Sequence, residues 1–163
     1  MSRFYLSVIT MLMTLTGCTS AVSHVATELD EEAALRGDLP MDPLQWGVIT
    51  VGANPEESTM STLFGNDIAV QYSRKDSAGN YPPGSVLSFV TWQRQEDGHW
   101  FGARMPARVK SVEFVEFASS EEGHSAARYR LYSGYPLKEA ESPKDRTDAR
   151  VKQLVSLRAA VMP

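Results

Sequence analysis

The chain of 163 residues has a single cysteine, Cys18. One thiol cannot close an internal disulfide, and it cannot supply a thiolate-rich zinc site, an iron–sulfur cluster or a redox pair. Histidine is also scarce, with three residues, and no other histidine or cysteine is spaced to join His99 or His124 in a metal site. These shortages exclude cysteine-based metal and redox chemistry. They favour a solvated or core role for both histidines.

Positive charge is in short supply as well. The chain has 16 Lys and Arg against 20 Asp and Glu, which gives a formal net charge of −4 and a pI near 5.4. No run of basic residues alternates with aromatic residues, as a nucleic-acid groove requires, so nucleic acid is not expected as a partner. The sequence also lacks a P-loop and a G-x-S-x-G nucleophile elbow. Its composition is otherwise that of an ordinary globular protein of one-domain length.

The features that are present begin at the N-terminus. Arg3 supplies positive charge, and residues 4–16 form an uncharged apolar run that is too short to span a bilayer comfortably. The sequence LTGC at residues 15–18 resembles the lipobox of bacterial lipoproteins. In that family the chain is cut before the cysteine and the thiol is acylated. Residues 1–17 are therefore predicted to be a lipoprotein signal peptide, with Cys18 as the lipidation site; the alternative is a buried thiol in an apolar segment.

The lipobox also indicates a location. Several acyl chains on Cys18 would satisfy the requirement that stable anchoring takes more than one chain. Thr19 stands where an Asp would indicate retention in the inner membrane, so by the same resemblance we expect the periplasmic face of the outer membrane. Residues 18–43 are small, polar and acidic. They are predicted to form a lipidated tether with a short helix over about residues 27–35, followed by one folded domain over residues 44–163.

Alternating apolar residues predict a sheet in the folded domain. Strands are expected over residues 45–52, 85–95, 110–117 and 127–134, and another ends at Phe64. The strand over 85–95 carries apolar bulk on both faces, with Phe89 and Trp92 on opposite sides, so it should be central. Asp97 and Gly98 predict a hairpin whose returning strand covers residues 99–105.

Capping signals predict two helices. Asn66 can cap a helix that starts with Asp67 and runs to about Arg74. A second helix is expected over residues 143–161, with Ser142 as its N-cap and Asp145 in an arrangement like a capping box. The prediction is an α+β fold, a mostly antiparallel β-sheet with one or two packed helices.

Three segments together look like the domain of the cytochrome P-460 family: residues 63–74, 81–93 and 100–117. The likeness rests on an Asn-Asp pair that opens a helix, a Pro-Pro-Gly turn that starts a long strand, and a tryptophan on that strand, namely Asn66, Asp67, Pro82, Pro83, Gly84 and Trp92. The resemblance implies an antiparallel sheet with packed helices around a haem pocket, commonly in a dimer. It also implies periplasmic proteins that oxidise hydroxylamine or bind small gases.

The sequence departs from that family at the haem attachment site. The C-x-x-C-H motif that fixes haem covalently is missing, because no cysteine follows Cys18. No covalently attached cofactor is therefore expected. Haem or a metal held noncovalently, for example through His124, stays open.

Two functions follow from these features. The first is an outer-membrane-anchored lipoprotein without catalytic activity, whose P-460-like domain keeps a pocket or a dimer face for a ligand or partner. The second is a redox enzyme or small-gas sensor with noncovalent haem or a metal. The residues expected around the pocket are Asn66, Asp67, Trp92, His99, Arg104 and His124. The sequence does not identify the small molecule that would bind there.

Overall fold

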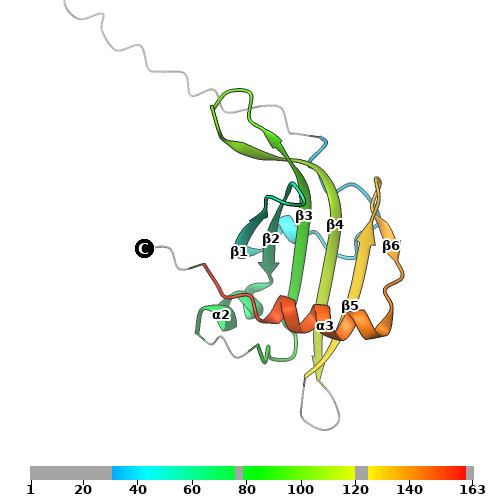
Figure 1. The fold of residues 1–163 in the computed structure, drawn as a ribbon. Helices are drawn as coiled ribbons and strands as arrows, with labels where there is room; N and C mark the ends of the chain where they lie inside the picture. Colours follow the sequence, from blue (N-terminus) through cyan, green and yellow to red (C-terminus); the bar gives the residue numbers. More distant parts are fainter. Residues whose placement is uncertain (1–30, 76–78, 120–124, 161–163) are drawn as a thin grey trace, which may run out of the picture.

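A computed structural model shows a six-stranded antiparallel sheet in which neighbouring strands are also neighbours along the chain (Figure 1). The structure describes residues 31–75, 79–119 and 125–160. The strands are β1 (Gly47–Asn54), β2 (Thr59–Gly65), β3 (Val86–Glu96), β4 (Arg104–Ser119), β5 (Ser125–Ser133) and β6 (Lys138–Ala140). A 3-10 turn, η1 (Pro43–Gln45), precedes them, and the helices are α2 (Asp67–Lys75) and α3 (Lys144–Val155). The predicted α+β class is confirmed.

The central strand has the alternation that its sequence predicts. β3 lies between β2 and β4, and Phe89 packs toward one face of the sheet while Trp92 is buried in the other. Helix α2 starts where its cap predicts, because the Asn66 side-chain oxygen accepts a hydrogen bond from the Ala69 amide at 3.1 Å.

Helices cover one face of the sheet, which we call the helix face. Its core includes Leu63, Leu87 and Val115 from the strands, together with Ala69 of α2 and Leu154 of α3. Helix α3 lies across the strands on this face, and α2 lies near the ends of β1 and β2 (Figure 1). The helical spacing of Val151, Leu154 and Val155 brings their side chains onto the sheet.

An irregular segment covers the opposite face, which we call the N-terminal face. Side chains of this N-terminal segment, residues 33–46, pack against a core that includes Phe114 and Val112. The backbone comes close to the end of the sheet at Gly37, which bridges Leu137; a Cβ at Gly37 would lie 2.2 Å from the Leu137 carbonyl oxygen. Residues 33–43 are therefore part of the folded domain, so the tether predicted for residues 18–43 is wrong over this stretch.

Other boundaries differ from the predictions. Residues 99–103 form a loop instead of a strand, and the strands expected over 99–105 and 110–117 are replaced by one long β4. Residues 31–34 form turns, while the rest of the short helix expected over 27–35 lies largely outside the described residues. Strand β6 was not predicted.

Helix α3 is shorter than expected and is capped differently. It ends at Val155 with Ser156 as the C-cap, and Val161 lies outside the described residues. The N-cap residue is Pro143, which makes no side-chain capping hydrogen bond. The predicted Ser142 cap is therefore wrong; the Ser142 hydroxyl instead accepts a hydrogen bond from the Thr147 hydroxyl at 3.4 Å.

Candidate functional site

The described residues that the sequence singles out do not form one site. Asn66 holds a turn together: its amide nitrogen donates to the Gly84 carbonyl at 2.8 Å, and its oxygen accepts from the Val86 amide at 3.2 Å. Asp67 is exposed in the first turn of α2, where a carboxylate is favoured by the helix dipole. Both residues therefore connect β2, α2 and β3, and this accounts for their positions without a ligand.

Trp92 is a core residue of the N-terminal face. Its side chain is buried, and its indole nitrogen donates a hydrogen bond to the Ala33 carbonyl at 2.9 Å. The ring thus joins the N-terminal segment to the central strand of the sheet. Its place in the structure is that of an anchor for this segment.

His99 and Arg104 lie in the β3–β4 hairpin, far along the chain from the α2 junction. They line one shallow hollow, but the His99 side chain is almost fully exposed and Arg104 forms an ion pair with Glu96 at 2.5 Å. His124 and Cys18 lie outside the described residues. Within residues 31–75, 79–119 and 125–160, no three His, Cys, Asp or Glu side chains are grouped so that they could hold a metal ion.

Sequence reasoning missed a charged cluster in the middle of the helix face. Glu113 of β4 is buried, and its two carboxylate oxygens accept hydrogen bonds from Arg150 of α3 at 2.7 and 2.6 Å. The Tyr129 hydroxyl of β5 donates to the same carboxylate at 2.7 Å. The Arg150 guanidinium also lies over the Phe89 ring, 5.1 Å from its centroid. One sequence feature could have indicated this cluster. The carboxylate of Glu113 stands between Val112 and Phe114, on a strand that carries apolar residues on both faces.

The electrostatics of this cluster fit a clamp better than an acid–base pair. Burial and the hydrogen bond to Glu113 raise the pKa of Tyr129, so its hydroxyl remains a donor at neutral pH. The hydrogen bonds that Arg150 donates to Glu113 also raise the pKa of Arg150. Since a bidentate arginine and a tyrosine occupy the carboxylate, it holds α3 on the sheet.

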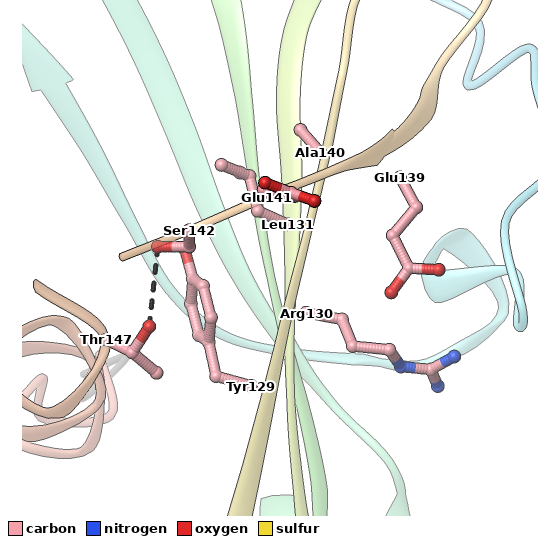
Figure 2. Close-up of a pocket in the computed structure, with 8 residues that line it drawn as sticks. All are labelled: Tyr129, Arg130, Leu131, Glu139, Ala140, Glu141, Ser142 and Thr147. Atoms are coloured by element: carbon pink, nitrogen blue, oxygen red, sulfur yellow. Dashed lines mark hydrogen bonds between the residues drawn. The ribbon is translucent and has the colours of Figure 1, made fainter. Parts of the chain in front are cut away.

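Two adjoining hollows lie beside the cluster. One, of about 440 Å³, runs along α3 and is lined by residues that include Glu113, Arg146 and Arg150. The other, of about 410 Å³, lies where the chain leaves β6 for α3, and residues from β5 and the α3 approach line it (Figure 2). Both hollows are lined by Tyr129, Leu131 and Ser142, so they form one groove, which we call the β5 groove. In Figure 2, Tyr129 lies beside Ser142 and Thr147, and Arg130 is on the other side of the strand near Glu139.

The β5 groove meets a sheet edge that is only partly paired, at Tyr129 and Arg130. β6 pairs with β5 at Leu131, Tyr132 and Ser133, whereas β5 begins at Ser125. In the part of the chain that the structure describes, no strand pairs with the outer edge of residues 125–130. An unpaired edge presents backbone N–H and C=O groups that can accept another strand. Such an edge beside a groove is the feature of this molecule best suited to binding.

Within the described residues, no helix has both the length and the apolar character needed to cross a membrane. Comparison with known proteins finds no family model and no curated protein that matches the chain. The site must therefore be interpreted from its own geometry and chemistry.

Proposed function

We propose that this protein is a lipid-anchored periplasmic lipoprotein that binds a partner protein and carries no catalytic activity of its own. The partner contributes an extended segment, which adds to the sheet along residues 125–130 of β5 and lies in the β5 groove. The observation that carries this proposal is the short β6, which covers only three residues of a nine-residue strand. Strand addition of this kind draws its affinity from main-chain hydrogen bonds and its specificity from neighbouring pockets.

The shape of the groove favours a protein segment over a small molecule. Sites for small ligands enclose most of the ligand surface, whereas both hollows of the β5 groove are open to solvent. The charges at the groove are mixed: Arg150 is paired with Glu113 and Arg130 with Glu116, while Glu139, Glu141 and Arg146 also line it. A polar segment recognised through its backbone suits such a surface better than a ligand of one charge.

The anchor is the second part of the proposal and rests on the lipobox at residues 15–18. We expect Cys18 to carry acyl chains that hold the protein on the periplasmic face of the outer membrane. Mass spectrometry of the full chain produced in bacteria should show acylation and cleavage before Cys18. The Cys18→Ser variant should lose both, and an unchanged product would contradict the anchor.

The likeness to the cytochrome P-460 family belongs to the same proposal. It is supported by an antiparallel sheet with packed helices, by the Asn66 cap of α2, and by the turn at Gly84, where φ is +83°. In this proposal the fold works without covalent haem, because the chain has no C-x-x-C-H motif. Purified protein should accordingly be colourless.

Two proline variants test the β5 edge. Consecutive N–H groups of a strand point to opposite sides, so one of Ala126 and Ala127 directs its N–H toward β4 and the other directs it outward. Both side chains are exposed, so proline mainly removes the N–H donor. The variant that loses the inward N–H should melt at a lower temperature. The other should melt like the wild type and lose the partner.

Binding is measured by crosslinking. A photo-crosslinking amino acid is placed at position 128 of the full chain in its own cells, and the matched control carries it at position 51 on β1. We expect a discrete crosslinked protein from position 128 that disappears with the outward proline. A product that persists with this proline, no product, or a product that is a second copy of this chain would each contradict the proposal.

A further inference from the structure

The tip of the β3–β4 hairpin exposes two aromatic rings. Trp100 is 72% exposed and Phe101 is fully exposed, and both lie in the loop between Glu96 and Arg104. The hairpin extends beyond the rest of the sheet (Figure 1). Adjacent exposed aromatic residues on a projecting loop have no role in the core, and such apolar surface commonly marks an interaction site.

The loop geometry keeps these rings directed away from the body. The Asp97 amide donates to the Ala103 carbonyl at 3.1 Å, and the Ala103 amide donates to the Trp100 carbonyl at 3.0 Å. Asp97 also accepts a hydrogen bond from the His99 amide at 2.8 Å. The loop is therefore closed by its own backbone, and apart from the adjacent residues no atom lies within 4 Å of where a Cβ would stand on Gly98 or Gly102.

The described chain begins at the same end of the molecule. The Ala33 carbonyl is bound by Trp92 of β3, Glu32 approaches Arg108 of β4 at 3.9 Å, and the Glu31 carbonyl accepts from the Tyr135 hydroxyl at 3.3 Å. Figure 1 shows this first segment beside the base of the hairpin. The chain between Cys18 and Glu31 can extend to about 45 Å, whereas the strand from Trp92 to the loop at Glu96 rises about 13 Å. A lipid on Cys18 can therefore lie in a bilayer that the hairpin tip touches.

We propose that Trp100 and Phe101 insert into the interface of the lipid bilayer that holds the anchor. This inference rests on the proposed lipid anchor and adds a second, non-covalent contact with the same membrane. Tryptophan favours the membrane interface, where its apolar ring and its N–H group both find suitable surroundings. The charged groups near the tip include both signs, with Glu96 paired to Arg104 and Asp97 beside His99. Insertion is therefore driven by the rings and does not require anionic lipids.

The test uses the full acylated chain, reconstituted in phosphatidylcholine vesicles that contain brominated lipids, which quench tryptophan emission on contact. Wild-type emission should be quenched, and the quenched part should be lost in Trp100→Phe, because Trp92 is buried and Trp46 packs against the core. A matched control places the probe elsewhere: Val51→Trp in the Trp100→Phe background puts a tryptophan at an exposed position of β1. Its emission should not be quenched.

The outcomes separate the tip from the anchor. A chain without acyl mass contradicts the anchor, whereas an acylated chain on vesicles with unquenched Trp100 overturns the tip insertion alone. Equal quenching of Trp100 and of the tryptophan at position 51 would also overturn it, since the hairpin would then have no special contact. Quenching that requires anionic lipid would contradict the stated driving force.

Discussion

The two faces of the sheet are closed in different ways. At the centre of the helix face, the buried carboxylate of Glu113 meets Arg150 and Tyr129. At the centre of the N-terminal face lie Val112 and Phe114, and the cover is an irregular segment held by side chains such as Trp92. A helix satisfies its own backbone hydrogen bonds but packs only a narrow stripe of apolar side chains on the sheet. A charged clamp such as Glu113 with Arg150 can therefore fix its position. An irregular segment depends on burying its side chains.

The largest expected loss in the free energy of unfolding comes from a substitution on the N-terminal face. Trp92→Ala should lower the free energy of unfolding by about 4 kcal/mol, because it leaves a cavity and removes the bond to Ala33. Chemical denaturation measures the loss. If the N-terminal segment is held through this ring, residues 33–46 should also become sensitive to protease in the variant. A stability equal to that of the wild type would contradict the role of Trp92 as an anchor.

The next effect tests whether the helix face depends on its charge pair. Glu113→Gln should lower the free energy of unfolding by about 3 kcal/mol, because Arg150 loses its bidentate partner at a partly buried site. The exposed pair of Glu96 and Arg104 is a matched control, and Glu96→Gln should cost less than about 1 kcal/mol. Equal losses in the two variants would show that burial does not distinguish these pairs.

The smallest effect concerns Tyr129 and alkaline pH. Tyr129→Phe removes one hydrogen bond to Glu113 and should cost about 1 kcal/mol near neutral pH. The pKa of Tyr129 is raised in the folded protein, and burial raises that of Tyr81 to about 12. Their stabilising contributions are present below pH 10 and are lost as the pH rises through the folded pKa values. Unfolding midpoints measured from pH 9 to 12 should fall less steeply in Tyr129→Phe, and identical slopes would contradict this assignment.

Local signals in the sequence predicted the elements that depend on neighbouring residues. The apolar residues of β3 and the Asn66 cap of α2 act within a few positions, so their patterns are readable. Strand β6 has only three residues and exists because β5 is there to pair with it. The apolar residues of the N-terminal segment are interrupted by a glycine, two prolines and two aspartates, which concealed the packing of Leu35 and Leu39.

The site was harder to predict than the fold, because its partners are distant in sequence. Glu113 and Arg150 are 37 positions apart, so no spacing rule connects them. The residues that were chosen instead, such as Trp92 and Asn66, were conspicuous because they hold the structure together. The open edge of β5 depends on where β6 ends, which the sequence does not mark.

The order of the strands also determines when each face can close during synthesis. Because each strand pairs with the one before it, the sheet can assemble strand by strand as the chain emerges, with its longest connection through α2. The covers of both faces depend on distant residues, since Ala33 needs a tryptophan 59 positions later, Gly37 needs Leu137, and the helix face needs α3. Neither half of the core is therefore fully covered until nearly the whole chain has been synthesised, and the bare sheet is exposed to aggregation until then.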